Sequence, residues 1–228
     1  MKRATLWLSS IAIAALMASA GAQTWDETTD GGGDAGDLPA SAQTTIGTGA
    51  LNTITGTYDA SDADLFLIKI VDPQSFSAIY NASTNFDTQI WLFDASGNGI
   101  AHNDDRSGLG LRSGLAGTDV FTTGVNAGQT IASQLVAGGL YLLGVTRYNR
   151  DARDGANAAI FANSPFSGIH SPQAGAGPLA SWVNSTVGNG VYQIDLTGAE
   201  YAAVPEPASM VALGAGLAGL LGLRRRKK

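Results

Sequence analysis

Alternating apolar and polar positions through the middle of the chain predict β-strands. Within residues 64–70, Phe66, Ile68 and Ile70 share one face of an extended segment, because successive strand side chains point to opposite faces. Residues 89–93, 140–145 and 191–196 show similar apolar or alternating runs next to Gly, Asn and Asp turns. No convincing amphipathic helix lies between these runs. The pattern predicts an all-β fold, an antiparallel β-sandwich with jelly-roll-like winding.

The N-terminal segment departs from this pattern and predicts a secretory signal helix. Lys2 and Arg3 precede an apolar stretch from Ala4 to Ala18, and small residues at 18–20 and 20–22 offer cleavage sites. The segment therefore predicts export through the secretion translocon and removal by signal peptidase. A retained anchor helix is the alternative, which the short apolar stretch disfavours.

The C-terminal segment combines a motif, an apolar run and a basic end. The motif is Val204, Pro205, Glu206 and Pro207, and the run from Ala208 to Leu223 follows it. The basic end consists of Arg224, Arg225, Arg226, Lys227 and Lys228. Positive charge resists crossing a bilayer, and the run is shorter than the roughly 20 residues of a perpendicular span. The segment predicts a short transmembrane helix that stops with its basic end in the cytoplasm.

These C-terminal residues closely resemble the PEP-CTERM sorting signal of Gram-negative bacteria. The resemblance implies that an exosortase-type membrane protease cuts near residues 205–207 and releases the protein or transfers it to the surface. It also implies transient inner-membrane anchoring, followed by location in the cell envelope, at the outer surface or in an extracellular matrix. A plain C-terminal membrane anchor is the alternative.

Four regions follow from these features. Residues 1–22 form the signal peptide, and residues 23–44 form an acidic, Gly-rich leader that is expected to be flexible because it has few large apolar groups to bury. Residues 45–200 form the β-sandwich domain. Residues 201–228 form the sorting tail.

Charge changes the picture once both ends are set aside. The remaining body has six Lys and Arg against 18 Asp and Glu, which leaves an excess of 12 negative charges. Nucleic acid and anionic membrane surfaces are disfavoured as partners, because both are bound by basic patches, whereas divalent cations suit such a body. The chain has no cysteine, so thiol chemistry and disulfides are excluded, and stability must come from the core, from bound ions or from both.

A second resemblance covers about residues 46–196. The pieces DADLF (62–66), FDTQIWLFD (86–94), NDD (103–105) and LVAGGLY (135–141) look like the bacterial pre-peptidase C-terminal type of β-sandwich domain. The resemblance implies an accessory module rather than a catalyst. The chain departs from the pattern between Arg147 and Trp182, where a long Asn-, Pro- and Gly-rich stretch lengthens a connection.

Two acidic groups flank the predicted strands and predict a calcium site. They are Asp59, Asp62 and Asp64 before one strand, and Asn103, Asp104 and Asp105 after another. Calcium takes about six to eight oxygen ligands, which acidic turns at one end of a sandwich can supply. Members of the resembled family bind calcium through such loops, so the two groups are predicted to converge on one ion. The alternative is that Asp and Asn serve turn geometry and solubility.

Catalytic chemistry has little support in the sequence. His102 and His170 are the only histidines and are expected to be loop residues with surface roles, and no Gly-x-Ser-x-Gly nucleophile motif occurs. Trp182 and Tyr148 are candidate glycan contacts, and the segment 147–154 holds half of the body's basic residues. That segment either contacts an acidic polysaccharide or is a solvated loop with internal ion pairs.

The function predicted from these features is that of a non-catalytic exported surface or matrix protein. Its role is expected to be structural or adhesive, with calcium as the candidate stabilising ion and exopolysaccharide as a candidate partner. A carbohydrate-binding module for exopolysaccharide is the alternative, and a secreted hydrolase is less favoured because no pair of carboxylates can be chosen without geometry.

Overall fold

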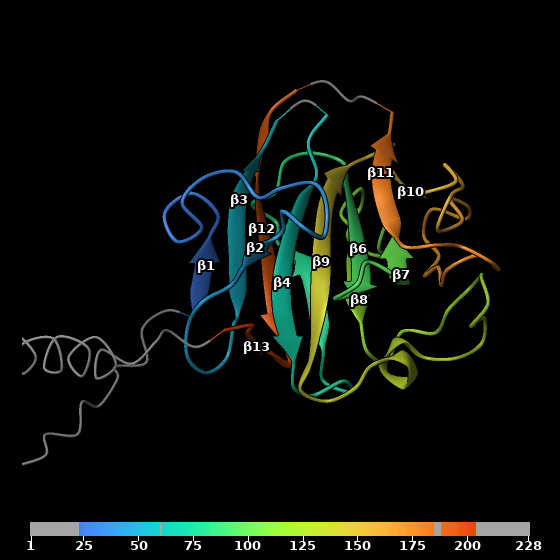
Figure 1. Ribbon diagram of the computed structural model, residues 1–228, viewed down its shortest axis with the longest axis horizontal. Coiled ribbons are helices and arrows are strands. Elements are labelled where there is room, and N and C mark those ends of the chain that lie inside the picture. The colour runs from blue at the N-terminus through green and yellow to red at the C-terminus, as the bar shows by residue number, and fades with distance from the viewer. Residues whose placement is uncertain (1–22, 60, 185–187, 204–228) are drawn as a thin grey trace, which may run out of the picture.

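The described part of the protein, residues 23–59, 61–184 and 188–203 of a computed structural model, is all-β (Figure 1). Its strands form two large sheets and one hairpin, with a short 3-10 turn, η1 (Ile131–Gln134). The all-β prediction is confirmed. The predicted signal helix and the predicted transmembrane helix lie outside the described residues. Within the described part, no helix is long and apolar enough to span a membrane.

The first sheet has five strands in the order β1-β3-β12-β5-β8. Their bounds are Thr24–Asp26 (β1), Thr53–Tyr58 (β3), Gly190–Thr197 (β12), Ser77–Tyr80 (β5) and Gly114–Ala116 (β8). β1 pairs with β3 in parallel, and the other pairs are antiparallel.

The second sheet has six strands and lies against the first. Along its main path are Ala199–Tyr201 (β13), Asp64–Ile70 (β4), Gly139–Arg147 (β9), Thr88–Asp94 (β6) and Gly99–Asn103 (β7). The sixth strand, Gln43–Thr44 (β2), pairs with β4 in parallel. The sheets are therefore mixed rather than wholly antiparallel, because β1 and β2 lie parallel to neighbouring strands.

The main core fills the space between the two sheets. Phe66, Ile68 and Ile70 of β4 are all buried in it, as the alternating pattern predicts. From the first sheet, Tyr192 and Ile194 of β12 enter the same core. Burial of these side chains supplies the apolar driving force that brings the sheets together.

A smaller apolar cluster covers the outer face of the second sheet. Leu65, Trp91 and Phe93 lie in this cluster, packed under the antiparallel hairpin of β10 (Asp151–Asp154) and β11 (Leu179–Val183). The long stretch between Arg147 and Trp182 therefore forms a third layer. This layer explains why β4 and β6 are apolar on both faces, as strands covered on both sides are.

Residues 23–44, which the composition predicts as a flexible leader, contain β1 and β2. Trp25 and Glu27 are buried, and Trp25 Nε1 donates a hydrogen bond to Gln43 Oε1 at 3.0 Å. The burial of one large aromatic side chain and pairing with β3 offset the ordering entropy of a Gly-rich segment. Composition averaged over the segment does not reveal these two contacts.

The two ends of the described body lie side by side. Tyr201 Oη donates to Thr24 O at 3.1 Å, and Ala203 forms a parallel bridge with Ile46. The chain enters and leaves the sandwich on the same side (Figure 1).

Candidate functional site

Strand register brings the predicted acidic groups to one end of the sandwich. Asp64 begins β4 opposite Val145, and Thr88 begins β6 opposite Arg147, so both strands start beside the end of β9. β7 ends at the same level, with Asn103 opposite Ile90.

At this end the carboxylates form two separate clusters. We call Glu27, Asp34 and Asp64 the Asp64 cluster, and Asp87, Asp104 and Asp105 the Asp104 cluster. In each cluster one carboxylate oxygen per residue lies within 4.8 Å of the others. Of the residues named from sequence, Asp64 lies in one cluster, and Asp104 and Asp105 lie in the other. The two groups are therefore not gathered around one position, and Asp59, Asp62 and Asn103 belong to neither cluster.

In the Asp64 cluster, a fully buried carboxylate has few polar neighbours. Asp64 is 0 % exposed, and its oxygens make no hydrogen bond of normal geometry within the described residues, although the Tyr192 hydroxyl and the Glu27 carboxylate lie close to them. Glu27 is also 0 % exposed, but its Oε1 accepts from Ala35 N at 3.0 Å and its Oε2 from Thr57 N at 2.8 Å. These two backbone contacts fix the Glu27 carboxylate beside Asp64. A carboxylate buried without partners is costly unless a proton or a cation neutralises it.

The pKa of Asp64 is raised both by burial and by neighbouring negative charges. Burial raises the pKa of the Asp64 carboxyl well above its usual value, and the negative charges of Asp62 and Glu27 raise it further, while the nearby Tyr192 hydroxyl opposes the shift. Burial also raises the pKa of the Tyr192 hydroxyl, with the Asp64 charge as the next cause. A divalent cation would relieve both effects, because it favours the ionised carboxylate.

An open acidic cavity of about 410 Å³ adjoins the Asp64 cluster through Asp34. Asp34, Asp37, Asp59 and Asp62 contribute carboxylates to its lining. Burial, then the Asp34 charge, raises the pKa of Asp62 to about 6. Among the described residues, the ion pair at this cavity is Arg150 Nη2 to Asp37 Oδ2 at 3.5 Å. The cavity offers a negatively charged approach to Asp64.

The Asp104 cluster also contains a buried carboxylate with no partner. Asp104 is 1 % exposed, and both of its oxygens lack hydrogen bonds within the described residues, as do Oδ1 of Asp87 and Oδ1 of Asp105. Burial raises the pKa of Asp104 to about 8, and the charges of Asp105 and Asp87 add to the effect. Burial likewise raises the pKa of Asp87 to about 6, which the Arg147 charge partly opposes.

Asn103 serves the loop rather than the cluster. Its Nδ2 donates to the carbonyl oxygens of Asp105 and Gly168 at 3.1 and 3.0 Å, and its Oδ1 accepts from Gly114 N at 3.0 Å. These bonds hold the turn that carries Asp104 and Asp105. The side chain of Asn103 is therefore a positioning group, as Asn in turns often is.

The size and chemistry of both clusters suit calcium. In each cluster the three carboxylates lie close enough for one ion to contact an oxygen of each at a calcium–oxygen distance of about 2.3 to 2.6 Å. All ligand atoms in the two clusters are carboxylate oxygens, which hard cations such as calcium prefer over nitrogen and sulfur.

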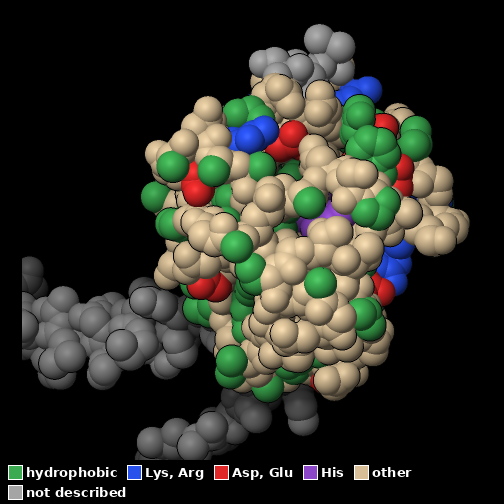
Figure 2. Space-filling model, turned by 90° about the vertical axis from the view of Figure 1, so that its right-hand side faces the viewer, with side chains coloured by type: hydrophobic (Ala, Val, Ile, Leu, Met, Phe, Trp, Pro, Cys, Tyr) green, Lys and Arg blue, Asp and Glu red, His purple; other side chains and the backbone are tan. Residues whose placement is uncertain are grey.

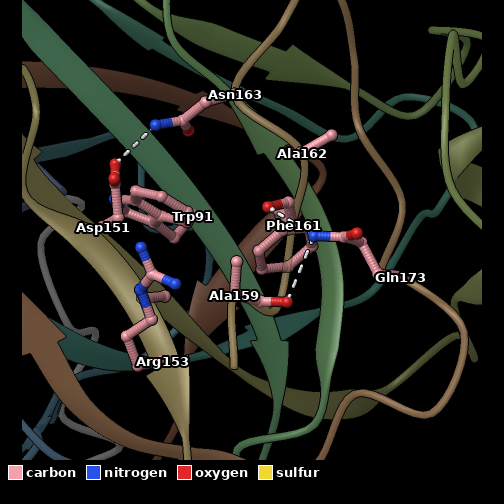
Figure 3. Close-up of a pocket in the computed structure, with 9 residues that line it drawn as sticks. Trp91, Asp151, Arg153, Ala159, Phe161, Ala162, Asn163 and Gln173 are labelled. Atoms are coloured by element: carbon pink, nitrogen blue, oxygen red, sulfur yellow. Dashed lines mark hydrogen bonds between the residues drawn. The ribbon is translucent and has the colours of Figure 1, made fainter. Parts of the chain in front are cut away.

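A further cavity of about 260 Å³ lies over the smaller apolar cluster on the outer face of the second sheet, beside β10 (Figure 3). Trp91 and Phe161 form its apolar wall, and Asp151, Arg153 and Asn163 are among its polar lining. Asn163 Nδ2 donates to Asp151 Oδ1 at 2.9 Å. The Nε atom of Arg153 is buried and has no hydrogen-bond partner within the described residues. The cavity can present both donors and acceptors to a polar ligand.

The two aromatic residues named as glycan contacts lie in different settings. Trp182 is half-buried, packs edge-on against Trp91 and donates from Nε1 to Asp37 O at 2.6 Å. Tyr148 is 40 % exposed, and its ring meets that of Phe166 at 87° with centroids 6.0 Å apart. Tyr148 is therefore available for contact on the surface, whereas Trp182 is partly committed to packing.

The basic segment 147–154 makes contacts outside itself. Arg150 binds Asp37 and Asn184, Arg147 lies over the Phe86 ring at 5.8 Å, and Arg153 lines the cavity of Figure 3. Figure 2 shows one face of the molecule, on which Lys and Arg side chains are scattered rather than gathered.

The expectation of surface histidines is wrong. His102 and His170 are both 0 % exposed, and the His102 ring stacks on Trp91 with centroids 3.7 Å apart. His170 is held by Thr123 Oγ1 at 2.6 Å and by Pro165 O at 3.0 Å. The long stretch after β9 contains His170 and places Phe161 and His170 against the His102 ring, which a single sequence does not reveal.

Three cluster residues were not named from sequence: Glu27, Asp34 and Asp87. Glu27 and Asp34 belong to the segment predicted as a leader, which the burial of Trp25 and the pairing of β1 and β2 hold on the sandwich. Asp87 directly precedes an apolar strand, and Asp64 likewise stands at the start of one. This position at a strand start could have identified Asp87 as a candidate ligand from the sequence.

Comparison with protein families identifies the end of the chain. Residues 203–227 match the PEP-CTERM protein-sorting motif. The chain carries a PEP-CTERM sorting signal. This signal indicates an exported, envelope-associated protein of a Gram-negative bacterium that is sorted by an exosortase. The motif residues 204–207 and the basic end lie outside the described residues.

The body of the protein has no such match. No curated protein and no solved structure is significantly similar to the chain. The resemblance of residues 46–196 to the pre-peptidase C-terminal type of domain stays a prediction.

Proposed function

We propose that this PEP-CTERM protein is a non-catalytic component of the cell surface or extracellular matrix, with a structural or adhesive role. Its body is a β-sandwich that calcium stabilises at the Asp64 cluster. The winding is jelly-roll-like, which the alternation of β3, β4, β5 and β6 between the two sheets supports.

The observation that carries the calcium assignment is the environment of Asp64. Its carboxylate is fully buried, makes no hydrogen bond of normal geometry among the described residues, and lies beside the buried Glu27 and the acidic cavity. A bound calcium ion would turn two mutually repelling buried carboxylates into ligands. Because Glu27 follows β1 and Asp64 begins β4, the ion would also tie the N-terminal segment to the second sheet.

The proposed route to the surface begins with the translocon and signal peptidase at residues 1–22. The tail then holds the protein transiently in the inner membrane until an exosortase cuts near residues 205–207. Since the described body ends at Ala203, next to Ile46 on the sandwich surface, cutting there would leave the fold intact.

Thermal unfolding with and without calcium tests the calcium role. The full-length protein in mild detergent is treated with a chelator, and calcium is then returned at millimolar concentration. We expect calcium to raise the melting temperature, because an ion that binds only the folded state stabilises it. Magnesium serves as the control ion, since it demands tighter octahedral geometry. An unchanged melting temperature would remove calcium from the proposal.

A carbohydrate-binding module is the second candidate function, favoured by the cavity of Figure 3. It joins an aromatic wall to a carboxylate, an amide and the unpaired Nε of Arg153, a set that suits sugar hydroxyls. Glycan-array binding that Arg153→Ala abolishes would favour this candidate, with Arg112→Ala as the control at a basic residue outside the cavity. Binding that survives Arg153→Ala would exclude this cavity.

A further inference from the structure

The Asp104 cluster joins one buried carboxylate to two half-buried ones. Asp104 is 1 % exposed and neither of its oxygens has a hydrogen-bond partner among the described residues, while Asp87 and Asp105 are partly exposed. Three carboxylates supply between three and six oxygens, whereas calcium takes about six to eight. A calcium ion held by five or fewer of these oxygens would keep coordination positions for a further ligand.

An exposed aromatic pair is fastened directly to this cluster. Tyr148 N donates to Asp87 O at 3.0 Å, and Asp105 N donates to Phe166 O at 3.0 Å. The rings of Tyr148 and Phe166 contact each other, and they are 40 % and 47 % exposed. Two backbone hydrogen bonds thus place an apolar, solvent-facing surface beside the carboxylates. Large exposed rings next to a polar site are typical of ligand contact rather than of core packing.

Positive charge also lies on the edge of the cluster. The positive charge of Arg147 favours the ionised form of Asp87, and the Arg147 guanidinium lies over the Phe86 ring. The rest of the body is strongly acidic, so an anionic ligand would be repelled except where a cation and Arg147 act together.

We infer that the Asp104 cluster binds a divalent cation whose free coordination positions take the carboxylate of an acidic polysaccharide, with the sugar ring resting on the Tyr148–Phe166 pair. The inference rests on the adhesive role proposed above and gives it a ligand class, polysaccharides that contain uronic acid. It is independent of calcium at the Asp64 cluster.

The test uses the full-length protein in mild detergent, with calcium chloride and trigalacturonic acid as probes in titration calorimetry. We expect the trisaccharide to bind in calcium and to lose at least about tenfold in affinity in chelator, because the ion supplies the main contact. Maltotriose, which has no carboxylate, serves as the comparison ligand and is expected to bind more weakly. Equal binding of trigalacturonic acid with and without calcium would overturn the inference, and so would equal affinity for maltotriose.

Two variants separate the cation from the aromatic pair. Asp104→Asn is expected to remove one calcium equivalent and the trisaccharide binding, whereas Asp195→Asn, the same change at an exposed position of β12, retains both. Tyr148→Ala is expected to keep the calcium and to weaken trisaccharide binding about two- to tenfold. Leu111→Ala, at an exposed apolar residue, is its control. Unchanged binding in Asp104→Asn or Tyr148→Ala would contradict the site.

Two further variants keep the test interpretable if Asp104→Asn does not fold or if the two clusters share an ion. If Asp104→Asn does not fold, Asp105→Asn at the half-buried edge of the same cluster takes its place, with the same expected loss. Asp64→Asn is expected to lose part of the melting-temperature response to calcium, because the Asp104 cluster still binds an ion, and to keep trisaccharide binding. Loss of the whole response and of trisaccharide binding in Asp64→Asn would show that one ion serves both clusters, and would overturn a separate Asp104 site.

Discussion

Replacing Asp64 with Asn should have opposite effects on stability in chelator and in calcium. The change keeps the shape of the buried side chain and removes its charge. Without calcium, burial and the charges of Asp62 and Glu27 favour the protonated form of Asp64. Asn resembles that neutral form and needs no proton, and its amide can donate a hydrogen bond toward the Glu27 carboxylate. We therefore expect Asp64→Asn to be more stable than the wild type in chelator.

The size of each effect follows from linkage. An aspartate carboxyl, whose ordinary pKa is 3.8, must take up a proton at neutral pH, which costs about 1.4 kcal/mol per pH unit and up to about 4 kcal/mol in all. Asp64→Asn avoids this cost. With calcium at 100 times its dissociation constant, the wild type gains about 2.7 kcal/mol. For a domain of this size that is a rise of about 5 to 10 °C in melting temperature, which Asp64→Asn forfeits.

Differential scanning calorimetry of both proteins, in chelator and in millimolar calcium, measures the effect. The expected result is that calcium raises the melting temperature of the wild type by more than that of Asp64→Asn, which keeps only the response of the Asp104 cluster. Asp195→Asn, exposed and bonded to Asn81 and Gln193, controls for the loss of one surface charge. A variant that is destabilised equally in both conditions would rule out this role, since Asp64 would then be an ordinary packing residue.

Three further predictions concern pH, the N-terminal segment and the tail. In chelator, stability should fall as pH rises from about 4 to 8. Burial raises the pKa of Asp62 and Asp87 to about 6 and of Asp104 to about 8, so the folded state holds protons that the unfolded state has lost. Urea unfolding across this range measures the stability, and a flat profile would contradict the prediction. Trp25→Ala should cost about 3 to 5 kcal/mol and reduce the calcium response to that of the Asp104 cluster, because it releases the segment that carries Glu27. An undiminished calcium-dependent melting shift would count against that link. In a host that has the exosortase, Glu206→Ala should leave the basic tail on the exported protein, and mass spectrometry that finds the tail removed would contradict the processing step.

Local periodicity was sufficient for the faces that pack within a sheet. Alternation along residues 64–70 correctly places Phe66, Ile68 and Ile70 on a buried face, because the period of a strand is a local property. The burial of Leu65 and Trp91 on the opposite face depends on the hairpin β10–β11, which arrives from far along the chain. No local sequence pattern predicts such a layer.

The candidate site also combines local features, which the sequence predicts, with long-range contacts, which it does not. Acidic turns before β4 and after β7 predict carboxylates at the end of a sandwich, and the register of β4, β9 and β6 puts them there. Which carboxylates meet depends on long-range pairing. Glu27 reaches Asp64 only because β1 pairs with β3, and Asp87 reaches Asp104 only because β6 pairs with β7.

A crystal structure of the protein grown in millimolar calcium would decide whether the Asp64 cluster is a calcium site. We predict an ion between Glu27 and Asp64, identified by its anomalous signal, with carboxylate oxygens at about 2.3 to 2.6 Å. A buried Asp64 that contacts only a proton or a water molecule under these conditions would contradict the calcium assignment.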